Sequence, residues 1–455
     1  MGALPRTSGP TTATCLSRLT GQSSALYLWG AMGAERRTLR QSFDSELGDF
    51  VEEICADLCR LESAAAAGCD PAEVSVEREL ALGADTFADI RVAAPGTAPF
   101  FVENKLAYTP GDLADRLRRK YGQPSPAWRG AQRVSVLLDL ESTSRVADLE
   151  RELRTAVAPG LAVELWGVAD LFARIRAAFD HDITDLSPAS LLGVREAIER
   201  AHWRRAFDGK FPDDPRAATL LWHLSPWELA RLHREAGLSP ADILEPRTYR
   251  GVVIVMADLC AFTSYVHDTR DSAVMRRRLT EYYSLARHAV LNAGGMLYQF
   301  VGDEVVGVFG LHRLPGTAAV QALTCVRSLF TVGTSVSRRW QRAIDRVQPS
   351  MGVHIGLAMG DIDLMPFRPF SRTHLGFMGE ALNLAGRLMT EATADQAVAT
   401  NTFYMAIDET LRRAFEAIGP VEAKNVGRIH GWRTTRAALE LPWPSAEAPH
   451  GRSRR

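Results

Sequence analysis

The sequence lacks a long uninterrupted apolar run, cysteines in a CxxC spacing, and an excess of charge of either sign. Its nearest candidate for a membrane segment, ALYLWGAMGA at 25–34, is shorter than the roughly 18–20 residues that a membrane helix needs. The basic start and long apolar block of a signal peptide are not found there either. We therefore expect a protein without a membrane segment, located in the cytoplasm.

The charge balance and the cysteine spacing exclude further classes. Lys and Arg number 53 and Asp and Glu number 54, which gives a formal net charge of −1. A neutral total argues against a protein that mainly coats nucleic acid or an anionic membrane. The six cysteines form no dense framework, and Cys55 and Cys59, four residues apart, are interpreted as core thiols of one helix.

The length of 455 residues suggests two or three domains, and the pattern predicts a mixed α+β and α/β protein. Helical periodicity at 39–61 is followed by strand-like runs at 89–92, 100–106, 133–138 and 161–165. The expected organisation is a disordered or spurious extension at 1–37, a separate α/β domain at 38–180, a helical connector at 181–247, a second α/β domain at 248–437, and a disordered tail at 438–455.

Two carboxylates in the second α/β domain follow strand-like segments. Residues 252–264 read VVIVMADLCAFTS, so Asp258 lies where an apolar strand stops and a helix begins. Residues 298–310 read YQFVGDEVVGVFG, which predicts a hairpin with Asp303 in its turn. If the two strands are neighbours, both carboxylates meet at one point, where they can bind the metal pair used in phosphoryl chemistry.

These two motifs, together with GEALNLAGRL at 379–388, resemble the successive motifs of class III nucleotide cyclases. The resemblance covers about residues 249–435. It implies a ferredoxin-like βαββαβ core, a nucleoside triphosphate substrate, and a head-to-tail homodimer whose active sites lie at the interface. It also implies Mn²⁺ or Mg²⁺ as cofactor, with two ions in each active site.

The resemblance implies a role for each matching residue. Asp258 and Asp303 match the metal-binding aspartates, and the Leu259 carbonyl matches a further ligand. Asn383 and Arg387 match the pair that orients the ribose and stabilises charge on the α-phosphate, and their spacing places them on one helix face. Lys424, in EAKNVGR, matches the lysine that pairs with the terminal phosphates.

The positions that select the base depart from both purine patterns. Adenylate cyclases generally carry Lys and then Asp or Thr there, and guanylate cyclases carry Glu and Cys, whereas this chain has Gln299 and Gly376. A Gln amide both donates and accepts hydrogen bonds, as the edge of uracil or cytosine requires, and Tyr298 and Phe377 can fill the space that a purine would need. These features resemble the pyrimidine cyclases of bacterial anti-phage (Pycsar) systems.

That resemblance implies UTP in preference to CTP as substrate, and a cyclic product that a separate effector protein reads in antiviral defence. An adenylate or guanylate cyclase in ordinary signalling remains the alternative, because some adenylate cyclase homologues also carry Gln at the Lys position.

The N-terminal domain carries a second acidic pattern. Asp89 on one strand, Glu103-Asn104-Lys105 on the next, and Glu52 or Glu53 on the preceding helix resemble the PD-(D/E)xK restriction-endonuclease-like fold. This resemblance implies that the N-terminal domain is a nuclease effector that contacts nucleic acid, and that the cyclase half is a nucleotide sensor. A sensor domain, or a strand with a charged edge, is the alternative. The basic run at 116–120 is interpreted as a solvated helix face.

Overall fold

The computed structural model describes residues 45–83, 86–106, 108, 110–128, 130–140, 146–243, 245–313, 315–367, 374–423 and 427–439. Residues Phe43–Arg455 form one unit, and Met1–Ser42 form another that lies outside the described residues. The extension expected at 1–37 therefore lies outside them too. So does the tail expected at 438–455, except for its first two residues, Ala438 and Leu439, which belong to the helix Arg436–Leu439. Among the described helices, none combines the length and apolarity that a membrane span requires.

The described part of the N-terminal half contains a five-stranded sheet in the order β1-β2-β3-β4-β5. Strands β1 to β3 are antiparallel, whereas β3, β4 and β5 run parallel to one another. The four strand-like runs predicted from the sequence are confirmed as β2 to β5, while β1 was not predicted. The strands are β1 (Ser75–Ala81), β2 (Phe87–Ala93), β3 (Phe100–Asn104), β4 (Arg133–Leu137) and β5 (Ala162–Trp166).

Helices cover this sheet with apolar faces. On α3, Cys55 and Cys59 are each 1% exposed, which confirms both as core thiols. Leu113 and Leu117 of α4 pack with Leu149 of α5 against the sheet, because residues three or four apart share one face of a helix. The helices are α3 (Ser45–Ala67), α4 (Pro110–Tyr121), α5 (Val146–Ala156) and α6 (Val168–Phe179).

A run of helices follows, and capping residues in the sequence mark where two of these helices begin. Ser187 and Ser225 cap α7 and α9. Each hydroxyl accepts a hydrogen bond from the backbone N–H three residues further along the chain, and a proline follows each cap. Proline is favoured there because its missing N–H would have no partner in the helix. The helices are α7 (Pro188–Ala206), α8 (Ala217–His223), α9 (Pro226–Ala236) and α10 (Pro240–Ile243).

The C-terminal half is built on an eight-stranded sheet of described residues in the order β12-β13-β11-β9-β6-β8-β7, with β10 paired to β9. The four strands β9-β6-β8-β7 are antiparallel neighbours. With α12 between β6 and β7, and α13 between β8 and β9, they form the ferredoxin-like βαββαβ core that the sequence predicted. The expected fold class, mixed α and β, is confirmed.

The strands of this sheet are β6 (Arg247–Leu259), β7 (Met296–Val301), β8 (Glu304–Phe309), β9 (Val353–Phe367), β10 (His374–Met378), β11 (Gln396–Thr400), β12 (Phe415–Ala423) and β13 (Gly427–Thr435). The helices around it are α11 (Phe262–Asp268), α12 (Ser272–Asn292), α13 (Pro315–Ile344), α14 (Glu380–Glu391), α15 (Asn401–Ala406), α16 (Glu409–Arg412) and α17 (Arg436–Leu439).

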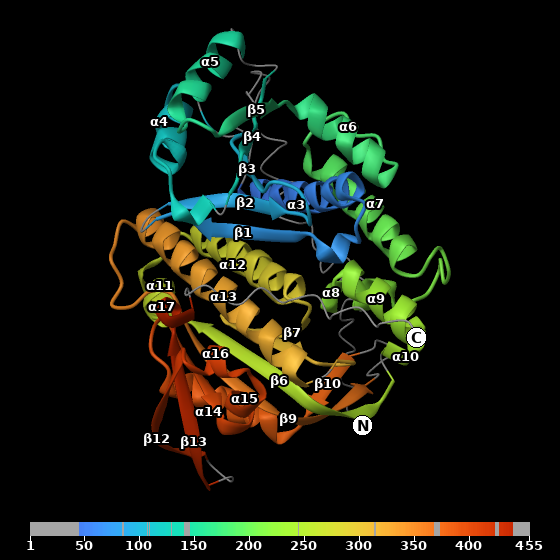
Figure 1. Ribbon diagram of the computed structural model, residues 1–455, viewed down its shortest axis with the longest axis vertical. Helices are drawn as coiled ribbons and strands as arrows, with labels where there is room; N and C mark the ends of the chain where they lie inside the picture. The colour runs from blue at the N-terminus through green and yellow to red at the C-terminus, as the bar shows by residue number, and fades with distance from the viewer. Residues whose placement is uncertain are drawn as a thin grey trace, which may run out of the picture. The chain divides into compact units, whose positions relative to one another are not determined.

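The two faces of the C-terminal sheet are covered differently. Helices α12 and α13 pack on one face and also touch β1, so they lie between the two sheets (Figure 1). Helix α14 and residues of the connecting helices cover the other face. A Cβ on Gly356 of β9 would lie 1.9 Å from the carbonyl oxygen of Ala385. Only glycine therefore permits α14 to approach the sheet so closely.

Candidate functional site

Asp258 and Asp303 lie at the same end of two neighbouring strands. Strand β6 ends one residue after Asp258, and it pairs with β8 up to Ala257 and Val305. Gly302 and Asp303 form the two-residue turn between β7 and β8, and Gly302 has a φ of 64°, in the left-handed region that glycine adopts readily. The predicted hairpin is confirmed, and the condition that the two aspartates follow neighbouring strands is met, because β8 pairs with β6.

The two carboxylates interact strongly. Burial, together with the hydrogen bond and the negative charge of Asp258, raises the pKa of Asp303 to about 8, although the backbone N–H groups of Asp303 and Leu259 act in the opposite direction. Atom Oδ2 of Asp303 is buried and has no hydrogen-bond partner among the described residues. A buried oxygen of this kind beside a second carboxylate needs a cation or a proton.

The donor set fits the hard divalent cations Mg²⁺ and Mn²⁺, which take carboxylate and carbonyl oxygens. Asp258 and Asp303 would hold them, with the Leu259 carbonyl as the further ligand that the sequence predicted. Within the described residues, no three His, Cys, Asp or Glu side chains form a metal-binding group.

Sequence reasoning missed His354, which lies opposite Asp258 on the neighbouring strand β9. Its Nε2 is 3.6 Å from Oδ2 of Asp258, and its Nδ1 is 3.4 Å from Sγ of Cys260. Burial lowers the pKa of His354, and the charge of Asp258 opposes that effect. The histidine is visible in the strand-like run after Gly352, but its partner depends on the register of β6 with β9.

Two tyrosines of α12 lie beside the turn that carries Asp303. Tyr282 is fully buried, and burial and then the charges of Asp258 and Asp303 raise its pKa. The hydroxyl of Tyr283 donates a hydrogen bond to the carbonyl oxygen of Gly302. The ring of Tyr283 also stacks on Phe300 of β7, with 4.4 Å between the centroids. Helix α12 thus holds the turn that carries Asp303.

Asn383 and Arg387 lie on the exposed face of α14, as their spacing predicts, while Ala381, Ala385 and Leu388 face the sheet. No contact between described residues joins Asn383 or Arg387 to the two aspartates of the same chain. Their roles stay predictions, and so does the role of Lys424, which lies outside the described residues.

The residues expected to select the base lie on β7 and β10. Gln299 is half-buried beside an irregularity in the pairing of β7 with β8. Gly376 of β10 pairs with Met365 of β9, and a Cβ on Gly376 would lie 2.3 Å from the ring of Phe367. Phe367 therefore occupies the space that a polar side chain at position 376 would need. Sequence reasoning did not single out this phenylalanine.

The aromatic residues expected near the base contact each other. The rings of Tyr298 and Phe377 meet edge to face, with 4.8 Å between their centroids, and the backbone N–H of Phe377 lies 3.4 Å from the Tyr298 hydroxyl. Phe377 is 7% exposed. The pair joins β7 to β10 across the sheet face that α14 covers.

The residues of the second acidic pattern also lie close together, on β2 and β3 of the N-terminal sheet and at the residue after β3. The ammonium group of Lys105 forms ion pairs with Asp89 and, at 2.9 Å, with Glu103. Glu103 is fully buried and accepts a hydrogen bond of 2.6 Å from the Tyr121 hydroxyl. Burial and then the charge of Asp89 raise the pKa of Glu52 to about 8, whereas Glu53 points toward Ser284. Glu52 is therefore the acid of α3 that lies near this cluster.

A second ammonium group, that of Lys120, pairs with the same two carboxylates. Lys120 Nζ lies 3.2 Å from Asp89 and 2.5 Å from Glu103, so two carboxylates face two ammonium groups. The interpretation of 116–120 as a solvated helix face is wrong for Lys120, whose side chain is 16% exposed. Lys120 lies at the C-terminal end of α4, and the helix packs on the sheet so that Lys120 reaches both acids. A divalent cation would have to displace an ammonium group there.

Comparisons with known proteins find likeness only in solved structures. No protein-family model and no curated protein matches the chain. The structure of the guanylyl cyclase Cya2 is 21% identical, covers 42% of this chain and 92% of its own, and gives a TM-score of 0.36. The adenylyl cyclase CyaB from P. aeruginosa is 18% identical, covers 42% and 96%, and also gives 0.36.

A bacterial light-regulated adenylyl cyclase is 15% identical, covers 61% of this chain and 70% of its own, and gives a TM-score of 0.38. Identities and scores as low as these carry no argument about substrate or mechanism. The chemistry of this chain is therefore argued from its own residues.

Proposed function

We propose that the C-terminal half is a nucleotide cyclase that converts a pyrimidine nucleoside triphosphate, UTP in preference to CTP, into its 3′,5′-cyclic monophosphate and pyrophosphate. The observation that carries this proposal is the half-buried pair Asp258 and Asp303, in which the buried Oδ2 of Asp303 has no hydrogen-bond partner among the described residues. Two carboxylates at a strand end and a hairpin turn suit the chemistry of phosphoryl transfer.

Asp258, Asp303 and the Leu259 carbonyl would hold two Mn²⁺ or Mg²⁺ ions. These ions, when bound, lower the pKa of the 3′-hydroxyl and neutralise the phosphate oxygens. The reaction forms a bond from the 3′-oxygen to the α-phosphorus and breaks the bond to pyrophosphate, which carries away the electron pair. The proton of the hydroxyl passes to solvent or to the leaving group.

The remaining roles follow from the exposed face of α14. Asn383 would orient the ribose, and Arg387 would stabilise the charge that develops on the α-phosphate. Because both side chains are exposed and make no described contact with the aspartates of their own chain, we infer that they serve the active site of a second copy in a homodimer. Lys424 would pair with the terminal phosphates.

The pyrimidine preference rests on the base-selecting positions. Gln299 supplies one donor and one acceptor for the edge of uracil. Phe367 fills the space beside Gly376 where a purine cyclase carries a second polar side chain. A pyrimidine is smaller than a purine and does not need that space. In this proposal, a separate effector protein reads the cyclic product as an antiviral signal.

Incubation of the purified chain with Mn²⁺ and each of the four ribonucleoside triphosphates tests the proposal. We expect cyclic UMP as the main product, with less cyclic CMP. Cyclic AMP or cyclic GMP as the main product would leave a cyclase but refute the pyrimidine preference. No cyclic product from any of the four, with the protein folded, would refute the cyclase itself.

A further inference from the structure

A cavity of about 810 Å³ lies between α3, the connecting helices α7 to α9, and α12. This volume is in the range of small-molecule sites. None of the described residues predicted for the cyclase site lines it, so the cavity is a separate feature of the chain. Tyr283 and Phe300, which lie beside the hairpin that carries Asp303, form part of its wall.

The cavity is long, because it follows one face of each of several helices. Its wall on α12 includes Tyr283, Arg287 and Leu291, which are spaced four residues apart and so share a face of the helix. Its wall on α3 extends from Asp49 to Arg60, a length of about 16 Å along the helix axis. A wall of this length favours an extended ligand over a compact one.

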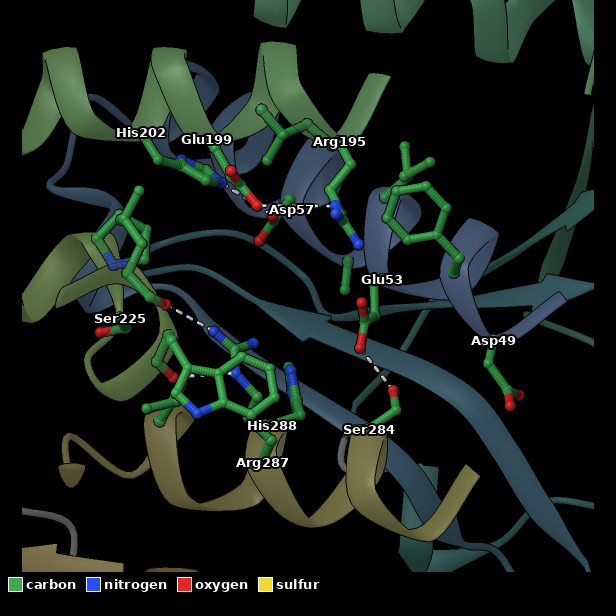
Figure 2. Close-up of a pocket in the computed structure, with 18 of the residues that line it drawn as sticks. Asp49, Glu53, Asp57, Arg195, Glu199, His202, Ser225, Ser284, Arg287 and His288 are labelled. Carbon is green, nitrogen blue, oxygen red and sulfur yellow. Dashed lines mark hydrogen bonds and ion pairs between the residues drawn. The ribbon is translucent and has the colours of Figure 1, made fainter. Parts of the chain in front are cut away.

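The acids of the wall already have partners within it. Oδ2 of Asp57 lies 2.9 Å from Nε2 of His202, and Glu53 accepts a hydrogen bond of 2.5 Å from Ser284. Figure 2 shows both pairs, with residues of α7 above the cavity and residues of α12 below it. These carboxylates are therefore not free to bind a cationic ligand.

The guanidinium groups of the wall are engaged as well. Arg60 donates to two backbone carbonyl oxygens and lies 5.6 Å from the ring centroid of Trp227. Arg287 does the same, and lies 5.3 Å from the ring centroid of Trp222. Arg195 lies 3.8 Å from the acid one turn further along α7. An anionic ligand would have to compete with these contacts.

Two further titratable groups of the wall are shifted toward their neutral forms. Burial and then the charge of Glu281 raise the pKa of Asp49 to about 7. Burial and then the charge of Arg78 lower the pKa of His288 to about 3, and its Nε2 lies 3.1 Å from a backbone carbonyl oxygen. Because an ion that enters such a wall loses water without gaining a free partner, a neutral ligand is favoured.

Apolar side chains form much of the remaining wall, and two of them stay exposed. Leu192 of α7 is 49% exposed and Trp222 of α8 is 51% exposed, although both line the cavity. Leu191 and Ile198 of α7 and Ile54 of α3 line it too. Arginines already lie over the two tryptophan rings, so packing of a hydrocarbon chain is favoured over stacking of a flat aromatic ring. Burial of these side chains by a hydrocarbon is favourable.

We propose that this cavity binds a neutral, linear aliphatic molecule, such as a medium-chain alcohol, whose methylene chain lies along α3 and covers Leu192 and Trp222. Three observations define this chemical class. They are the length of the wall along α3, the pairing of its charged groups with one another or with backbone, and the apolar side chains that it leaves exposed. This binding does not depend on the proposed cyclase activity.

Equilibrium dialysis of the full chain against radiolabelled n-decanol tests the proposal, because it measures binding even where the heat of apolar burial is small. We expect saturable binding, and we expect n-hexanol, with four fewer methylene groups, to bind at least about 50-fold more weakly. Labelled n-decanoate and n-decylammonium should each bind at least about tenfold more weakly than the alcohol, because their charged ends find the charges of the wall already paired.

A substitution that fills the cavity locates the binding. Ala218 of α8 lines the cavity and is exposed, so Ala218→Trp should fold, and its ring should weaken n-decanol binding at least about tenfold. Ala236→Trp is the matched control, since Ala236 is exposed on α9 outside the wall, and it should bind like the wild type. Leu192→Glu, which places a charge on the wall, is the second variant and should also weaken binding.

Three results would overturn the proposal. They are binding of n-decanol that does not saturate, binding of either ion as tight as that of the alcohol, and binding that neither Ala218→Trp nor Leu192→Glu weakens.

Discussion

At the scale of single residues, Asp303 should contribute to activity while it lowers stability. Asp303→Asn removes a half-buried carboxyl group whose ionisation is opposed by burial and by Asp258, so the free energy of unfolding should stay equal or rise. The rate of the proposed cyclase reaction should fall at least about 100-fold, because a proposed metal ligand is lost. Steady-state product formation and denaturant unfolding measure the two effects. Asp271→Asn, at the N-cap of α12, should change neither, and a fully active Asp303→Asn would contradict the metal role.

Phe367 provides a test of base selection, because its ring fills the space beside Gly376. Phe367→Ala should open that space and raise the ratio of purine to pyrimidine turnover several-fold. Phe367 is 42% exposed, so stability should change little. Competition between ATP and UTP, with both cyclic products quantified, measures the ratio. Met405→Ala, at a residue that is 57% exposed on α15, is the control, and an unchanged ratio in Phe367→Ala would argue against steric selection.

His288 makes the protein sensitive to acid. Burial and then the charge of Arg78 lower its pKa from 6.5 to about 3, so the folded chain binds fewer protons than the unfolded chain between these values. The free energy of unfolding therefore falls as pH drops from 6.5 toward 3, by up to about 1.4 kcal/mol per pH unit. His288→Gln should flatten this slope relative to wild type. His267→Gln, whose side chain is 85% exposed, should not.

At the scale of elements, local chemistry explains why some strands were predicted and one was missed. The hairpin of β7 and β8 was visible because Gly302 and Asp303 separate two apolar runs. Strand β1 reads SVERELA, and its central Arg78 and Glu79 are charged, which argues for a surface loop. Both are buried, because ion pairs from α3 and α13 compensate them. A single strand's sequence does not contain those partners.

Helix α4 should stabilise the N-terminal sheet through Lys120. Lys120→Ala would leave Asp89 and Glu103 to share Lys105, so the free energy of unfolding should fall by about 3 kcal/mol, the scale for removing one member of a buried ion pair. Arg119→Ala, at an exposed position of the same helix, should change it by at most about 0.5 kcal/mol. Denaturant unfolding of both variants gives the comparison.

The same cluster leads us to expect that the wild type does not cleave DNA. Lys105 and Lys120 already compensate both acids, so Mn²⁺ gains little by entering. Incubation of supercoiled plasmid with Mn²⁺ checks this. Cleavage that Lys105→Ala abolishes would contradict the expectation and would favour the nuclease alternative for the N-terminal half.

At the scale of the whole molecule, site residues could be predicted from the sequence only where their position does not depend on contacts between distant segments. Asp258 and Asp303 were predictable because each follows a recognisable strand. His354 was not, because its place beside Asp258 depends on the register of β6 with β9. The cavity was not predictable either, since its acids on α3 lie more than 100 residues from His202 and more than 200 from Ser284. Such sites exist only after distant helices pack together.

The two halves of the chain are joined by a buried charge network around Glu79. The residue has a φ of 56° in β1, a left-handed conformation that non-glycine residues rarely adopt. Its carboxylate accepts hydrogen bonds from Arg339, at 3.0 and 3.1 Å, and from Ser335, at 2.6 Å, both on α13. Arg339 also pairs with Glu281 of α12. The strained residue thus anchors the N-terminal sheet to the helices beneath it.

Loss of this anchor should separate the unfolding of the two halves. In Glu79→Gln the Arg339 guanidinium loses its ion pair with Glu79 and keeps the pair with Glu281, so the free energy of unfolding should fall by about 3 kcal/mol. Two denaturant transitions should then replace coincident ones, with the N-terminal half unfolding first. Glu77→Gln is the control, because Glu77 pairs with Arg91 within the N-terminal sheet and should change stability by at most about 1 kcal/mol. If Glu79→Gln unfolds in one transition with unchanged stability, the network does not couple the two sheets.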